Sequence, residues 1–378
     1  MTIGDLGKVV TGKTPSTKND ILWNGSIPFI TPKDIQGLKH IVRTERTVTQ
    51  VGANTVKGSI IPPNAICVSC IGNIGYAGMT TQWSITNQQI NSIIVNKEND
   101  ANFVYYLIRG LWKFFKNYEG QSTTLSILNK SQFSKIEVEI PSLEKQKKIA
   151  AILSSIDAKI EVNQKINDNL LAQAQTLYKQ FFPYSVQDDL PDGWRIGTVG
   201  EIIEIHDSKR IPLSGADRAK MEKKIYPYYG AASLMDFVDN YIFDGKYLLL
   251  GEDGTVVDDA GYPILQYVWG QFWVNNHAHI LTGRLGYDVE SLYMLFKQTP
   301  VKSIVTGAVQ PKISQANLRS IQVVIPPEHN LREYNDLVEP LFSLFRANEE
   351  DCKTLTALRD TLLPKLMSGE MDVSAVQL

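Results

Sequence analysis

The clearest pattern in the chain is a stripe of apolar residues spaced alternately three and four positions apart, which occurs twice. Such spacing, kept up over about four heptads, is typical of a helix that packs on another helix in a coiled coil. It predicts one helix from about 143 to 182 and a second from about 328 to 368. Before each stripe, in 136–141 and in 321–326, apolar and polar residues alternate until a proline, which predicts a short strand.

The two stripes belong to an internal repeat. The stretch Leu128–Pro141 matches Ile313–Pro326 under a shift of 185 residues, and the same shift continues through both helices. The two halves also match near their starts, with Ile3 on Ile196, and in their middles, with Asn87 on Asn276. These two matches correspond to shifts of 193 and 189. The predicted helix–helix seam consists of Leu153, Ile156, Ile160, Asn163, Leu170 and Leu177 in the first helix, and Val338, Leu341, Phe345, Asn348, Leu355 and Leu362 in the second.

The repeat predicts an α+β protein of two similar mixed α/β globular domains, at 1–142 and 183–327, each followed by a long helix. The helices occupy 143–182 and 328–378, the latter with a short tail. Antiparallel packing of the two helices would make a coiled coil and give the chain approximate two-fold symmetry.

Asparagines interrupt the apolar seam at Asn163, Asn167 and Asn348. Polar seam residues cost stability but can fix the register of a coiled coil. The alternative is that these positions are partly solvated, and the sequence leaves both interpretations open.

The amino-acid composition is that of a globular protein and argues against a secreted or membrane-spanning one. The 378 residues are 43% hydrophobic, which is ample for more than one core. Only three cysteines occur, which fits a reduced, cytoplasmic protein. No apolar run approaches the roughly 20 residues of a membrane helix, and Met1–Thr14 lacks the features of a secretory signal, so no membrane partner is expected.

The net charge of −2 hides an asymmetry along the chain. Residues 1–141 carry 14 Lys and Arg against 9 Asp and Glu, whereas residues 328–378 carry 5 against 10. The basic first part suits a polyanion, although the excess is modest, and the acidic last part suits a basic protein. Two similar but non-identical globular domains on a rigid helical spacer are suited to bind a bipartite, asymmetric DNA site. The bases between the two half-sites would then not be specified.

An ordered set of motifs supports this interpretation. The chain contains Gly12–Lys18, then Trp23–Asp34, Ser69–Gly75, Asn87–Ile90, and Ile136–Pro141 followed by Leu143-Glu-Lys-Gln. With these motifs it resembles the specificity subunit of type I restriction–modification systems over nearly its whole length. The second half departs from the pattern at its helix start, where Glu328-His-Asn-Leu replaces the usual Leu-Glu-x-Gln.

The resemblance implies a division of labour. Each globular domain would be a target-recognition domain for one half of a split site in double-stranded DNA. The coiled coil would set the spacer and dock two modification subunits, which methylate adenine with S-adenosylmethionine. Restriction subunits would add translocation and cleavage driven by ATP, with Mg2+. This chain itself would hold no cofactor and carry no catalysis.

Candidate DNA contacts in the first domain are basic, hydroxyl and amide side chains. Lysine reaches phosphates, Arg reads guanine, and Asn or Gln pairs with adenine. Each has an ordinary alternative as a turn residue, a solvated arginine or a buried amide. The candidates are Lys13, Thr14, Ser16, Lys18, Lys33, Arg43, Arg46, Asn87 and Gln88.

The second domain is acidic, so its candidates stand out more clearly. Tyrosine can stack on a base or hydrogen-bond to phosphate, but it is as often a core residue. The candidates are Lys209, Arg210, Tyr228, Asn275, Asn276 and His277.

Metal and catalytic sites are expected to be absent. His277-x-His279 has only Asp253, Asp258 and Asp259 as further candidate ligands, and Cys67-x-x-Cys70 has no second pair. No methyltransferase box, Walker loop or nucleophile triad stands out. The competing hypothesis is a coiled-coil scaffold that bridges two identical protein partners without binding DNA.

Overall fold

The computed structural model describes residues 1–35, 37–120, 126–307 and 309–376. The chain divides into two compact units. The first unit combines Met1–Lys165 with Asn348–Leu378, and the second is Ile166–Ala347. Both long helices therefore contribute one segment to each unit.

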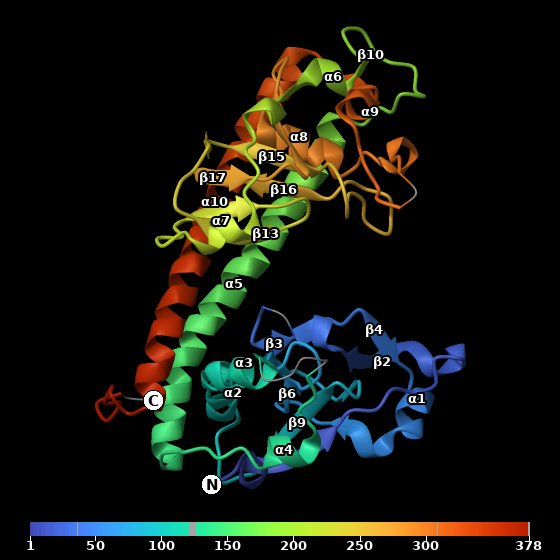
Figure 1. Ribbon diagram of the computed structural model, residues 1–378. Helices are drawn as coiled ribbons and strands as arrows, with labels where there is room; N and C mark the ends of the chain where they lie inside the picture. The colour runs from blue at the N-terminus through green and yellow to red at the C-terminus, as the bar shows by residue number, and fades with distance from the viewer. Residues whose placement is uncertain (36, 121–125, 308, 377–378) are drawn as a thin grey trace. The chain divides into compact units, whose positions relative to one another are not determined.

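The first unit is built on two small sheets (Figure 1). In the larger one, the central strand β9 pairs antiparallel with β1 and with β6. The order is β1 (Gly7–Thr11), β9 (Ile90–Val95), β6 (Ile66–Ser69), β7 (Ala77–Thr80) and β3 (His40–Ile41). The smaller sheet has the order β4 (Arg46–Val48), β2 (Trp23–Ile30), β8 (Ser84–Thr86) and β5 (Ile60–Ile61).

Helix α2 closes the core of the first unit. Its N-cap Asp100 accepts from the Phe103 N–H, and the next residues bury their side chains against both the sheet and the long helices. Helix α2 spans Ala101–Gly110, and the other helices are η1 (Ile3–Leu6), η2 (Asp20–Leu22), η3 (Pro32–Ile35), α1 (Gln50–Thr55), η4 (Lys57–Ser59), α3 (Trp112–Gly120) and α4 (Lys130–Ser134).

The second unit repeats the central motif of the first. Its strand β18 pairs antiparallel with β11 and with β15, as β9 does with β1 and β6. The sheet has the order β11 (Ile203–Ile205), β18 (Ala278–Gly283), β15 (Tyr247–Gly251) and β16 (Leu265–Val268). The other sheet has the order β13 (Leu234–Val238), β12 (Tyr226–Tyr229), β17 (Gln271–Val274) and β14 (Phe243–Asp244). The helices are α6 (Val199–Ile202), η5 (Asp207–Lys209), α7 (Gly215–Ala219), α8 (Val289–Phe296), η6 (Lys302–Ile304) and α9 (Gln315–Arg319).

Hydrogen bonds correct the alignment of the repeat near its start. Thr2 and Asp5 form a capping box, and so do Thr198 and Glu201. The starts of the halves therefore correspond under a shift of 196, and the predicted 193 is wrong. The indels lie between the strands, so no single shift applies.

In the middle of the repeat, the alignment predicted from the sequence is wrong by one residue. The side chain of Asn87 accepts from the Gln89 N–H, and Asn275 accepts from the His277 N–H in the same way. Asn87 therefore corresponds to Asn275 rather than to Asn276, under a shift of 188.

The strands expected before the long helices form in only one half. In the second unit, β19 (Gln322–Ile325) pairs antiparallel with β10 (Arg195–Thr198). In the first, residues 136–141 make only an isolated bridge, Thr2 to Glu137. The sheets of both units, together with their covering helices, confirm the α+β fold class.

The long helices are α5 (Leu143–Phe181) and α10 (Glu328–Met367). In the first unit, Asp157 contacts Arg359 and Asn163 contacts Asp351, so the two segments run antiparallel. In the second unit, Tyr334 donates to the Ala174 carbonyl, and Asn167 donates to the Phe345 carbonyl, which gives the same direction. No described helix is long and apolar enough to cross a membrane.

The seam positions lie inward on these helices. Leu153, Ile156, Ile160, Asn163, Leu170 and Val338 are buried, and Leu177, Leu341, Phe345, Asn348, Leu355 and Leu362 are partly buried. Asn163 and Asn167 are 0% and 3% exposed, which favours a role inside the seam over a solvated one.

Candidate nucleic-acid interface

In the first unit, the sheet topology gathers three loops at one end. Because β9 is antiparallel to β1 and β6, its first residue lies beside the last residues of both neighbours. The loops at this end are 12–18, 70–75 and 87–89, which we call the first loop cluster. Backbone hydrogen bonds join them, from Gly12 N to Ile90 O and from Cys70 N to Gln89 O.

Most of the first candidates lie on this cluster. Lys13, Ser16 and Lys18 are exposed. The Thr14 hydroxyl donates to Gln88 Oε1 across 2.7 Å, so the side chains of two predicted contacts meet directly. Asn87 instead uses its amide within its own loop, donating to Gln89 and accepting from that residue's N–H, so it shapes the turn.

Three cationic candidates belong to the smaller sheet and its connections. The Arg46 guanidinium lies 3.6 Å from the ring centroid of Trp23, whose Nε1 donates to Ser16 O in the loop cluster. Arg46 therefore borders that cluster. Lys33 pairs with Glu45 at 3.8 Å, and Arg43 is exposed on the connection from β3 to β4.

The second unit has the corresponding cluster at the ends of β11 and β15 and the start of β18. It comprises 206–213, 252–258 and 275–277, which we call the second loop cluster. Lys209 and Asn276 are exposed there. The ring of His277 is 42% exposed, and its Nδ1 pairs with Asp253.

Two candidates in the second unit, Tyr228 and Asn275, are buried, and a third, Arg210, is partly buried and fully engaged within the protein, which corrects their expected role. Tyr228 is 2% exposed and its hydroxyl bonds to the Leu213 backbone, so its ring presents no face to a base. Asn275 is 4% exposed and accepts from the His277 N–H. Arg210 pairs with Glu252 and donates to three backbone carbonyls, those of Asp207, Asn276 and Ala278.

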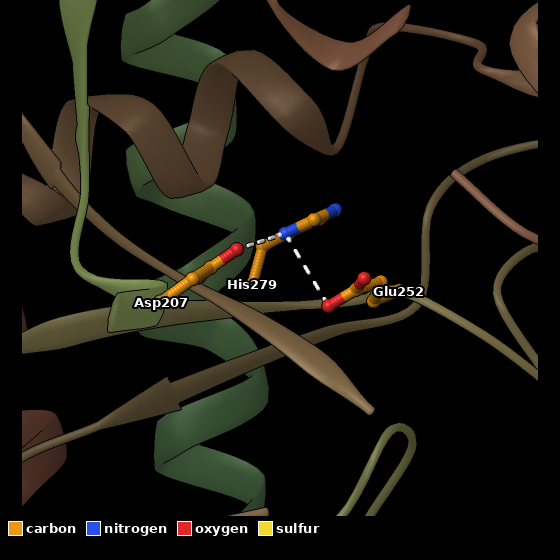
Figure 2. A group of neighbouring side chains, drawn as sticks. All are labelled: Asp207, Glu252 and His279. Carbon is orange, nitrogen blue, oxygen red and sulfur yellow. Dashed lines mark hydrogen bonds and ion pairs between the residues drawn. The ribbon is translucent and has the colours of Figure 1, made fainter. Parts of the chain in front are cut away.

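A buried charged group lies at the base of this second cluster (Figure 2). The ring of His279 lies between two carboxylates, with Nδ1 2.6 Å from Asp207 and 3.8 Å from Glu252. Its Nε2 donates to the Ile313 carbonyl across 2.8 Å. Arg210 reaches Glu252 at 2.6 Å, and Lys312 reaches it at 3.2 Å.

The carboxylates in this group are held ionised. Burial alone would raise the pKa of Asp207, but the hydrogen bond from His279, that residue's charge, and the Ile280 N–H together lower it below its ordinary value. Burial likewise acts to raise the pKa of Glu252, and Arg210 and His279 overcome it, so this pKa is also lowered. The two ring nitrogens of His279 both face hydrogen-bond acceptors, the Asp207 carboxylate and the Ile313 carbonyl.

The geometry of this group is that of an ion-pair network rather than a metal site. Asp207, Glu252 and His279 each offer a ligand atom within 4.8 Å of the others. However, Arg210 and Lys312 supply the positive charge that a metal would bring, and both nitrogens of His279 are already used. His277 pairs with Asp253 instead, so the two histidines of His277-x-His279 do not offer nitrogen atoms to one common metal ion.

The two cysteines of the C-x-x-C motif are core residues. Cys67 and Cys70 are 0% and 2% exposed. Burial raises the pKa of Cys67 to about 12 and that of Cys70 to about 11, so both remain thiols.

Comparison with known proteins decides what these clusters belong to. The family model described as type I restriction modification DNA specificity domain matches residues 1–172 and, a second time, residues 191–361. The chain belongs to this family. It is a specificity subunit of a type I restriction–modification system, with two recognition domains and no catalytic role of its own, as the sequence motifs indicated.

Individual relatives agree with the family. The MjaIX specificity subunit of Methanocaldococcus jannaschii is 27% identical, with 98% of this chain and 93% of the relative covered. The HindI specificity subunit of Haemophilus influenzae is 36% identical over a shorter stretch, 44% of this chain and 38% of the relative. The crystal structure of the S subunit from M. genitalium shares the fold, with a TM-score of 0.56, 18% identity, and coverage of 97% and 95%.

Proposed function

We propose that each recognition domain reads one half of a bipartite, asymmetric site in double-stranded DNA through its loop cluster. One observation supports this proposal most directly. The two loop clusters occupy equivalent positions in the two domains, but they present different side chains. Lys13, Thr14 and Gln88 line the first, and Lys209, Asn276 and His277 line the second. Lysines contact phosphates, and amides, hydroxyls and histidine can reach base edges, so unlike loops read unlike half-sites.

The coiled coil is proposed to set the spacer between the half-sites and to dock two modification subunits. Apolar side chains exposed on the helices away from the seam support docking, since they have no partner surface within the coil. In the first unit these are Val162 and Leu358, and in the second they are Ile166, Leu337 and Leu344.

The remaining partners follow from membership of a type I system. The modification subunits would use S-adenosylmethionine to methylate adenine, and restriction subunits would use ATP and Mg2+. Among the described residues of this chain, the one group with metal-ligand chemistry is already paired with the cationic side chains of Arg210 and Lys312. Three buried, unpaired thiols support a reducing compartment such as the cytoplasm.

The proposal is tested by mapping methylated adenines in the source genome with and without this gene. We expect one split, asymmetric motif to lose methylation when the gene is deleted, and the motif to return with the gene. If the reconstituted complex with its modification subunits assembles but methylates no motif, the chain is a scaffold and the DNA-reading role is wrong.

A further inference from the structure

Each recognition domain holds one buried polar side chain at the same place in its central strand. In the first, Asn91 on β9 is 3% exposed. Its Oδ1 accepts from the Thr11 hydroxyl across 2.6 Å, and its Nδ2 donates to the Leu128 carbonyl at 3.3 Å. In the second, His279 on β18 is 0% exposed and bonds to Asp207 and to the Ile313 carbonyl.

Strand registers make the two sets equivalent. Asn91 pairs with Val68 in β6, and His279 pairs with Leu250 at the same point of β15, one residue before each strand ends. The third members also correspond: Leu128 N donates to Cys70 O, and Ile313 N donates to Glu252 O, each across 2.8 Å. We call Thr11, Asn91 and Leu128 the first anchor, and Asp207, His279 and Ile313 the second.

The anchors sit where the loop clusters begin. Thr11 directly precedes the loop of Lys13, and Asn91 follows the loop of Gln88. In the second domain, Asp207 lies two residues before Lys209, and His279 lies two residues after His277. A shift of an anchor residue therefore moves the side chains proposed to read DNA.

The two anchors differ in charge. The first is made of a hydroxyl, an amide and a carbonyl, all neutral. The second holds the Asp207 carboxylate beside the His279 ring, and Arg210 links this carboxylate further to Glu252 and to the Asn276 carbonyl. A buried ion left without its partner is much costlier than a lost neutral hydrogen bond.

We propose that the anchors are positioning devices for the two loop clusters, and that recognition of the second half-site depends on the Asp207–His279 ion pair. Asp207 and His279 are thus positioning residues for specificity and do not touch DNA themselves. This inference rests on the proposed function, because it explains what holds in place the same loops that are proposed to read DNA.

The test replaces Asp207 by Asn, which keeps the shape and removes the charge. In the complex with modification subunits, methylation is measured on two DNA libraries, one randomised in each half-site. For D207N we expect discrimination at the second half-site to fall at least tenfold and discrimination at the first to change less than twofold. The matched control is D244N, a carboxylate-to-amide change on exposed Asp244 of β14, and it should change neither.

A second measurement does not use DNA. Hydrogen exchange of the free chain should quicken in 206–213, 275–277 and 309–313 of D207N and stay unchanged in the first loop cluster. Unchanged exchange there, or equal loss of discrimination at both half-sites, would overturn the anchor.

A failure of the proposed function would be distinguishable from a failure of the anchor. In that case the complex without any substitution would already show no discrimination at either half-site. If D207N does not fold, the variant T11V in the first anchor decides. It removes only a hydroxyl, and it should lower discrimination at the first half-site by a few-fold and spare the second. No change at the first half-site with T11V would refute the positioning role.

Discussion

Arg359 on α10 donates to the Asp157 carboxylate on α5 across 2.7 Å, and the two side chains are only 7% and 4% exposed. The second oxygen of Asp157 accepts from the Tyr106 hydroxyl of α2 at 2.5 Å. One carboxylate thus joins the coiled coil to the recognition domain in the first unit.

Because the pair is buried, Arg359→Met should leave an uncompensated charge and lower the free energy of unfolding by about 3–5 kcal/mol. Adding Asp157→Leu should recover at least half of the loss, as measured by urea unfolding. Arg332→Ala, which breaks an exposed pair with Glu328 on α10, should cost less than about 0.5 kcal/mol. A loss below about 1 kcal/mol for Arg359→Met would show that Asp157 does not need this partner.

Replacing Lys13 and Lys18 together by Ala should weaken DNA binding by the assembled complex, because two phosphate-neutralising charges are lost. The slope of log affinity against log salt concentration should become shallower by about 2. The control pair is Lys97 and Lys135, both exposed but outside the first loop cluster. Equal affinity and slope for the two double variants would exclude the loop of Lys13 from the interface.

Gly12→Ala should disturb the first loop cluster directly. A Cβ on Gly12 would lie 2.1 Å from Asn87 O and 2.2 Å from Thr86 Oγ1, so the backbone segments must separate. The expected loss of unfolding free energy is about 1–3 kcal/mol, with weaker recognition of the first half-site. Gly58→Ala, whose Cβ would meet nothing within 4 Å, is the control and should change neither property. A fully stable, fully specific G12A protein would contradict the close approach.

Asn163→Leu should stabilise the coiled coil by about 1 kcal/mol. Asn163 is fully buried, its Nδ2 donates to Asp351, and its Oδ1 has no hydrogen-bond partner among the described residues. Asp351 is partly exposed and can be hydrated once that donor is gone. Thermal unfolding measures the gain, with the exposed Asn169→Leu on the same helix as control. A fall in stability would instead mean that the amide is a net stabilising member of the seam.

The second unit should lose stability in acid because of Asp207 and Glu252. Both pKa values are lowered in the folded state, so their contribution is complete above the unfolded values of about 3.9 and 4.3 and is lost as the pH falls through the folded values. Between pH 5 and pH 3, the free energy of unfolding should therefore fall more steeply for the native chain than for Asp207→Asn. Parallel curves for the two proteins would contradict the ionised network.

The long helices were predictable almost to the residue, since a sustained spacing of three and four depends on local sequence alone. They are observed at Leu143–Phe181 and Glu328–Met367. The exposed lysines of the loop clusters were predictable too, because charge and turn chemistry suffice. Arg210 and Tyr228 have equally suitable chemistry, but their tertiary neighbours decide the outcome: Tyr228 is buried, and Arg210 is held in an ion pair with Glu252.

The anchors show why the rest was not predictable from sequence. Thr11 corresponds to Asp207, Asn91 to His279 and Leu128 to Ile313, under shifts of 196, 188 and 185. A single shift for the whole chain, or a shift that is wrong by one residue in the central strand, cannot bring these positions together. The capping boxes at Thr2 and Thr198 were the sequence signal that could have fixed the first shift.

The make-up of the first unit has a consequence for biosynthesis. Its core joins residues of α2 and α5 to Leu363 and Leu366 of α10 and to Val373 beyond it. A ribosome adds these residues only after it has synthesised the entire second recognition domain. The domain that is translated first is therefore the last to complete its core, and a stop codon just before residue 363 would damage the first recognition domain rather than the second.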